Sequence, residues 1–186
     1  AVKAGYIQRR ADDLLYEAVT AGRYAHVLAP NRTGKSSLIA AVSARVESAN
    51  IRVATLDLKQ IAPKESDTAV GRWFYTLAYR LLRQLRIRMA LQEWWQDKAL
   101  LTNRQRLLEF YAEIILPRID GNIVVFVDSL MAIEGPKFAP PLLASIRAAH
   151  DARVMDPDFQ RLTFVLVGEC DPVDLIDDPA QSHFNV

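Results

Sequence analysis

Apolar stretches of two kinds alternate along this chain. Residues 123–127 and 162–167 are apolar almost throughout. Residues 23–29 form a short apolar run that ends at a proline-containing loop, and residues 51–58 alternate apolar and polar positions. The segments between these runs repeat their apolar residues every three to four positions, as a helix with one buried face does. Buried strands separated by helices are typical of a parallel sheet covered on both faces. The pattern therefore predicts an α/β fold with an open, mainly parallel, doubly wound sheet.

Helices are predicted over residues 10–20, 34–47, 65–89, 102–116 and 140–153, with one more helical turn from 172 to 177. The prolines fall at the joints between elements, and no Ser/Gly-rich linker divides the chain, so residues 1–186 are expected to form a single domain. His26, in the middle of the first predicted strand, is interpreted as a core histidine. Trp94 and Trp95 are interpreted as core aromatics, with base stacking as the alternative.

Composition excludes several classes of protein. Hydrophobic residues make up 51% of the 186 residues and charged residues 24%, which is ordinary for a globular domain and unlike a disordered chain. No apolar run approaches the roughly 20 residues needed to span a bilayer, and residues 1–10 lack the pattern of a signal peptide. The single cysteine, Cys170, cannot form an internal disulfide or a thiolate metal cluster. A cytoplasmic protein with no membrane contact is therefore expected.

The net charge of +1 conceals an asymmetry, because residues 1–118 carry a net +8 and residues 119–186 a net −7. Two opposite halves argue against a protein that binds nucleic acid through its overall charge. Residues 72–88 hold five arginines on a predicted helix. We interpret them as a solvated face, with contact to nucleic acid or to an acidic partner as the alternative.

The segment with the clearest chemistry is residues 29–37, Ala-Pro-Asn-Arg-Thr-Gly-Lys-Ser-Ser, between a predicted strand and a predicted helix. It matches the phosphate-binding pattern G-x-x-x-x-G-K-[ST] except at Ala29. Backbone N–H groups of such a loop cradle phosphates, Lys35 is expected to reach the β- and γ-phosphates, and Ser36 to coordinate Mg²⁺. The alternative is a helix start without a ligand. The nucleotide-binding residues predicted here are Pro30, Asn31, Arg32, Thr33, Gly34, Lys35, Ser36 and Ser37.

Asp128 follows the apolar run 123–127 and is the predicted second half of a metal site with Ser36. A carboxylate that ends a neighbouring strand holds Mg²⁺ opposite the loop hydroxyl in P-loop proteins. ATP and Mg²⁺ are therefore the expected cofactors, with Lys35 and Asp128 in catalytic roles. The next residue is Ser129, and a hydroxyl is not a general base near neutral pH. Glu134, in the following loop, is either a replacement base or a solvated carboxylate, so weak or impaired hydrolysis is predicted.

These residues belong to an ordered set that resembles the AAA-like domain of STAND-type P-loop ATPases, found in bacterial multidomain proteins. The similarity covers nearly the whole chain and is carried by residues 6–12, 22–24, 27–30, 34–37, 53–58, 94–95, 125–128, 145–147, 161–168, 174–176 and 184–185. The resemblance implies an ATP-driven regulatory switch, in which the nucleotide controls attached sensor or effector domains of a signalling or defence protein. It also implies that Gln8 and Arg9 line the base, and that the last strand of the sheet and a helical lid lie beyond residue 186.

Three positions depart from the family pattern: Ser129 stands in place of Glu, Asp171 in place of Thr, and His183 in place of Pro. These departures concern turnover rather than binding. Two other functions stay open at this point. One is a scaffold without turnover that uses the fold for protein contacts, and the other is an AAA-type assembly factor that acts on DNA through the arginine-rich helix. A homo-oligomer is compatible with each of them.

Overall fold

The computed structural model of the chain describes residues 7–30, 32–63, 70–133 and 137–169. Within these residues, parallel strands form one sheet in the order β1-β4-β3-β2. Its strands are β1 (Ala25–Leu28), β2 (Arg52–Asp57), β3 (Ile123–Asp128) and β4 (Leu162–Gly168). The predicted α/β class and parallel sheet are confirmed. The last of the described strands, β4, lies between β1 and β3, so β1 and β3 do not pair with each other.

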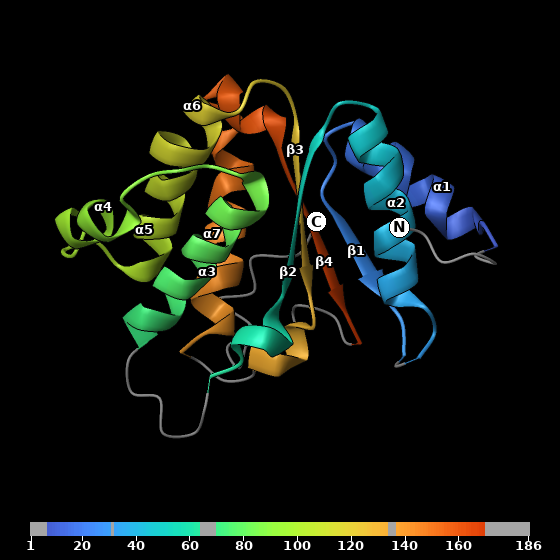
Figure 1. Ribbon diagram of the computed structural model, residues 1–186, viewed down its shortest axis with the longest axis horizontal. Helices are drawn as coiled ribbons and strands as arrows, with labels where there is room; N and C mark the ends of the chain where they lie inside the picture. Colours follow the sequence, from blue (N-terminus) through green and yellow to red (C-terminus); the bar gives the residue numbers. More distant parts are fainter. Residues whose placement is uncertain (1–6, 31, 64–69, 134–136, 170–186) are drawn as a thin grey trace.

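Helices cover both faces of this sheet (Figure 1). On one side lie α1 (Arg10–Thr20) and α2 (Lys35–Ser48), and on the other lie α3 (Val70–Leu85), α4 (Leu91–Asp97), α5 (Asn103–Glu109), α6 (Leu116–Arg118) and α7 (Ala139–Ala152). A π-helical segment, Phe110–Ile115, joins α5 to α6. Short 3₁₀ turns follow β2 (Leu58–Ile61) and β3 (Leu130–Ile133), and another precedes β4 (Pro157–Arg161). The predicted helical turn at 172–177 lies outside the described residues.

Two cores form because alternate side chains of a strand face opposite sides of a sheet. In β3, Val124 and Phe126 belong to the core with α1 and α2, whereas Val125 and Val127 belong to the larger core with α3, α5 and α7. β4 is buried along its whole length and β3 up to Val127, which explains why their sequences show no polar alternation. Asp128 continues the series of Val124 and Phe126, so its side chain faces the side of the sheet that α2 covers.

The first strand is less buried than its sequence predicts. Ala25 and Val27 are half-buried, but His26 and Leu28 are exposed. Within the described residues β1 pairs with β4 on one side only, so it lies at the edge of the sheet. The interpretation of His26 as a core histidine is therefore wrong, because a place at the edge leaves one side of the strand open.

The tryptophan pair lies on a short helix, α4, that the sequence pattern did not predict. Trp95 is buried in the larger core, as predicted, and Trp94 is partly buried with its indole N–H donating to Glu113 at 2.9 Å. In the part of the chain that the structure describes, no helix combines the length and the apolar character needed to cross a bilayer.

Candidate functional site

A cavity of about 270 Å³ lies where the parallel strands end. In open α/β sheets the carboxyl edge of the strands is where ligands bind. The walls come from four places: the loop after β1, the turn after β2, the end of β3 with its turn, and the end of β4. The lining residues are Arg32, Gly34, Lys35, Ser36, Ser37, Lys59, Asp128, Ser129, Leu130, Met131, Gly168 and Glu169.

The loop between β1 and α2 presents the start of a helix to this cavity. Gly34 has φ +89°, a left-handed conformation that favours glycine, and its carbonyl accepts the first helical hydrogen bond from Leu38 N at 3.0 Å. The chain therefore turns sharply and enters α2 at Lys35. The free N–H groups and the dipole at the start of a helix favour an anion there.

Lys35 is held by the loop that precedes it. Its Nζ donates to the carbonyl oxygens of Ala29 at 2.5 Å and Pro30 at 2.8 Å. Thr33 Oγ1 donates to the same Pro30 oxygen at 2.7 Å, which fixes the turn further. A lysine ammonium carries three protons, so one donor is left for a ligand in the cavity. Of the other predicted loop residues, Arg32, Ser36 and Ser37 line the cavity, and Asn31 lies outside the described residues.

The loop between β1 and α2, which we call the phosphate-type loop, is contacted by Arg9, which precedes α1. Neither Arg9 nor Gln8 lines the cavity. Arg9 Nη1 donates to the carbonyl oxygen of Thr33 at 3.0 Å. The same guanidinium lies so close to Gly34 that a Cβ atom there would stand 2.6 Å from Arg9 Nη2. Gln8 donates to Asp13 at 2.6 Å, within the first turns of α1. A role for Gln8 and Arg9 at the base of a nucleotide stays a prediction.

Asp128 is half-buried at the end of β3 and lines the cavity from the side opposite the loop. Burial raises the pKa of its carboxyl above the ordinary value. Asp57, its register partner at the end of β2, also raises the pKa of Asp128, whereas the Ser129 backbone N–H, Lys59 and Lys35 lower it. A carboxylate whose ionised form is disfavoured in this way gains from a cation placed beside it.

No acidic side chain follows Asp128 directly. Ser129 occupies that position at the cavity wall, with a left-handed φ of +67° and its backbone N–H bonded to Val167 O at 3.1 Å. Glu134, the predicted alternative base, lies outside the described residues. Besides Asp128, the acidic residue that lines the cavity is Glu169, which is exposed at the end of β4.

Lys59 also lines the cavity, and the sequence motif does not point to it. Asp57 caps the 3₁₀ turn that carries Lys59 by accepting from Lys59 N at 3.1 Å and from Gln60 Nε2 at 3.2 Å. Trp73 fixes the other end of this turn, because its indole N–H donates to Ile61 O at 2.6 Å. The cavity therefore has cationic side chains on two sides, with Lys35 on one and Lys59 on the other.

This set of groups fits a polyphosphate with a divalent cation. Helix N–H groups, a spare lysine proton and a second lysine suit phosphate oxygens, while a hydroxyl and a carboxylate suit Mg²⁺. Among the described residues there is no cluster of three or more His, Cys, Asp or Glu side chains that could hold a metal alone. Mg²⁺ is usually bound through one or two carboxylates plus substrate phosphates. The cavity, of about 270 Å³, is slightly smaller than the roughly 300–1,000 Å³ of typical ligand pockets.

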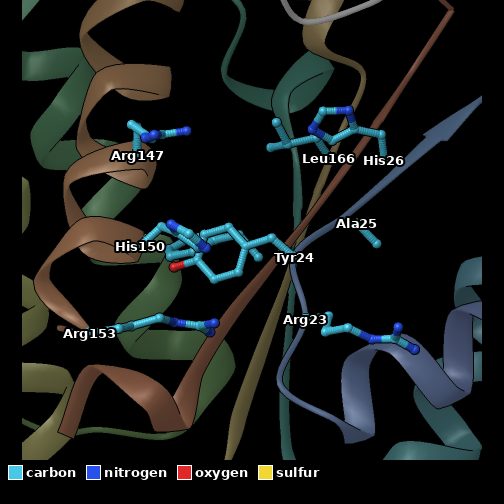
Figure 2. A pocket seen from close by; sticks show the side chains of 9 residues that line it. Arg23, Tyr24, Ala25, His26, Arg147, His150, Arg153 and Leu166 are labelled. Carbon is cyan, nitrogen blue, oxygen red and sulfur yellow. The ribbon is translucent and has the colours of Figure 1, made fainter. Parts of the chain in front are cut away.

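A second cavity, of about 400 Å³, lies between α7 and the edge strand β1 (Figure 2). Arg147 and His150 of α7, with Arg153 directly after it, line the cavity on one side, and Tyr24, the residue before β1, lies against His150 and Arg153. Arg153 donates to the carbonyls of Gly22 at 2.7 Å and Leu162 at 2.5 Å, and its guanidinium lies 4.4 Å from the Tyr24 ring centre. Its contacts tie the start of β1 to α7, a structural role that needs no ligand.

Comparisons with known proteins identify the family and the fold. A model of the AAA-like domain family matches residues 3–186. An uncharacterised WD repeat-containing protein of Synechocystis sp. (strain ATCC 27184 / PCC 6803 / Kazusa) is 30% identical over 185 residues, which is 97% of this chain and 15% of that protein. The Aeropyrum pernix ORC1 protein, solved in complex with DNA, has a similar fold, with a TM-score of 0.55 and 14% identity over 100% of this chain and 45% of that one. The fold is thus a P-loop NTPase core, and the chain belongs to the AAA-like domain family.

Proposed function

We propose that this chain is the ATP- and Mg²⁺-binding domain of a STAND-type regulatory switch, with weak or impaired hydrolysis. The observation that carries the proposal is the meeting of Lys35, Ser36 and Asp128 around one cavity at the start of α2. These three residues come from two elements on opposite sides of the cavity. Their groups are the ones that P-loop proteins use for the terminal phosphates and the metal.

Each residue has a distinct part in this proposal. The loop N–H groups and Lys35 hold the phosphates, and Ser36 and Asp128 hold Mg²⁺, which neutralises charge on the phosphate oxygens. Ser129 follows Asp128 at the cavity wall, and it does not take a proton from water near neutral pH. Binding with slow turnover is therefore what the described residues favour.

The switch role rests on the size of the relative as well as on the site. This chain spans only 15% of the WD repeat-containing protein that it resembles. A nucleotide domain of this kind, joined to repeats, would act by changing the contacts between the two parts. The proposal therefore places the output of ATP binding in attached or partner domains.

The direct tests are calorimetric titration of Mg·ATP into the wild type and the Lys35→Ala variant, and thermal unfolding of both proteins with and without Mg·ATP. A ligand at about 100 times its Kd stabilises a protein by about 2.7 kcal/mol, which is about 5–10 °C in Tm for a chain of this size. We expect that shift in the wild type and its loss in Lys35→Ala. Lys137→Ala removes an exposed lysine outside the cavity and is the matched control. Negligible heat and no Tm shift in the wild type would leave a scaffold without nucleotide as the function.

A further inference from the structure

The side of the molecule around the end of α3 carries an arginine surface, formed by Arg52, Arg83, Arg86, Arg88 and Arg118 with the ring of Tyr79. Three hollows of about 560, 670 and 620 Å³ meet there. Each pair of hollows shares one arginine: Arg88 joins the first to the second, Arg83 the second to the third, and Arg86 the first to the third. The guanidinium groups therefore stand between connected hollows rather than scattered on a convex face.

Four of these five arginines have no side-chain partner in the part of the chain that the structure describes, whereas Arg118 donates to the carbonyl oxygens of Glu113 at 3.1 Å and Ile114 at 3.2 Å. Among the described residues, Arg52, Arg83, Arg86 and Arg88 are exposed, and their guanidinium groups make no hydrogen bond or ion pair. Within the described residues Arg10, Arg23, Arg72 and Arg104 also lack such a partner, but they line none of these hollows. Other guanidinium groups are held in place. Arg45, Arg106, Arg147, Arg153 and Arg161 bond to carboxylates or carbonyl oxygens.

The acidic residues of these hollows do not cancel this charge. Asp57, Glu93 and Asp120 line them, but none forms a salt bridge with an arginine of the surface. Like charges held together without counter-charges repel one another, and an anion relieves that cost. A partner with several negative charges in a row fits a set of guanidinium groups from three parts of the chain.

Tyr79 indicates which class of anionic partner fits the surface. It lies on α3, lines the two hollows that Arg83 also lines, and is 46% exposed. An exposed aromatic ring beside arginines in a groove is the arrangement on which single-stranded nucleic acids stack their bases while the backbone meets the cations. An acidic peptide has no comparable use for the ring, and duplex DNA keeps its bases inside the stack.

We propose that the arginine surface binds single-stranded nucleic acid, with Tyr79 stacking a base and Arg83, Arg86 and Arg88 contacting phosphates. Arg52, Arg86 and Arg88 lie at the end of α3 and the start of β2, whereas the phosphate-type loop follows the end of β1 (Figure 1). The third hollow extends along β2 to Asp57, but none of the three hollows shares a lining residue with the cavity at that loop. The proposal does not depend on the proposed function.

The test is fluorescence anisotropy of labelled oligo(dT) and oligo(rU) with the whole chain at low salt. Contact with about three phosphates predicts a log Kd against log salt slope of about 2, since each single-strand phosphate contributes about 0.7. Arg83→Gln/Arg88→Gln should weaken binding at least tenfold and lower the slope by about 1.4. The control Arg10→Gln/Arg104→Gln removes two exposed arginines on α1 and α5 that line none of these hollows, and should change the Kd less than twofold.

Tyr79 separates stacking from simple attraction between charges. Tyr79→Ala should weaken binding about fivefold or more, and Tyr79→Phe should retain it because the ring is kept. Circular dichroism of every variant checks that the fold is intact. Three outcomes each overturn the proposal: no anisotropy change at low salt, equal weakening in the control pair, or no effect of Tyr79→Ala together with equally tight binding of polyglutamate. The oligo(dT) and oligo(rU) arms show whether DNA or RNA is preferred.

Discussion

Replacing Gly34 by alanine tests the loop geometry directly. An L-residue in the left-handed conformation of Gly34, with φ +89°, costs about 1–2 kcal/mol. The new Cβ would also stand 2.6 Å from Arg9 Nη2, closer than a Cβ can approach. The guanidinium is the end of a flexible side chain and can move, but it then loses its bond to Thr33 O, worth about 0.5–1.5 kcal/mol. We expect Gly34→Ala to lower the free energy of unfolding by about 2–3 kcal/mol and Tm by about 4–12 °C.

Gly121→Ala is the matched control for this variant. Gly121 has φ +87°, but a Cβ there meets nothing within 4 Å, so the variant carries the backbone strain without the contact. It should cost about 1–2 kcal/mol. In an Arg9→Ala background, Gly34→Ala should lose the part of its cost that comes from Arg9, and a double-mutant cycle measures that part.

Thermal unfolding with and without Mg·ATP gives both readouts. Gly34 lines the cavity that we propose for the phosphates, so the Mg·ATP shift in Tm should vanish in Gly34→Ala, while Gly121→Ala should keep it. Equal destabilisation by the two variants, together with a preserved ligand shift in Gly34→Ala, would refute the reasoning that this loop holds the phosphates.

Three further predictions concern single side chains. Asp128→Asn should raise the stability of the ligand-free fold at neutral pH, because the raised pKa of Asp128 means that its ionisation destabilises the fold. The gain should disappear below the ordinary aspartate pKa of about 3.9, where Asp128 is neutral in both the folded and the unfolded chain. Thermal unfolding as a function of pH measures it. Ser129→Glu should raise phosphate release above that of Ser129→Gln, which adds the same bulk without a carboxylate. Arg106→Met should cost about 2–4 kcal/mol in denaturant unfolding, because this buried guanidinium donates to the carbonyls of Lys98, Ala99 and Leu101; no change would contradict the role of those bonds.

The phosphate-type loop and Asp128 could be predicted from the sequence because each depends on local order. Residues 29–37 combine a strand end, a glycine at a required turn and a lysine at the start of a helix. Asp128 ends a run that is buried on both faces, and strand alternation alone then places its side chain on one face of the sheet. The sequence near Asp128 does not say which face of the sheet α2 covers. Because α2 packs on the face toward which Asp128 points, the start of α2 and Asp128 line the same cavity.

Features that depend on strand order could not be predicted in the same way. The run 23–29 is as apolar as a buried strand, yet β1 lies at the edge of the described sheet because β4 pairs with only one of its sides. That place leaves His26 exposed. Lys59 reaches the cavity because β2 lies beside β3 and because Asp57 and Trp73 hold its turn. No pattern within residues 51–61 contains that information.

Backbone strain gives an independent indication of where this fold serves a ligand. Four non-glycine residues described here have positive φ: Arg32, Asn50, Arg86 and Ser129. Asn50 and Arg86 follow the ends of α2 and α3, where a left-handed residue is the usual way to end a helix. Arg32 and Ser129 end no helix, and both line the cavity. Such conformations cost about 1–3 kcal/mol each and persist where the surrounding structure holds them, often at ligand sites. The strain that helix endings leave unexplained therefore lies at the cavity wall, beside the residues whose groups fit phosphate and metal, since Ser129 directly follows Asp128 and Arg32 lies in the loop that leads to Lys35.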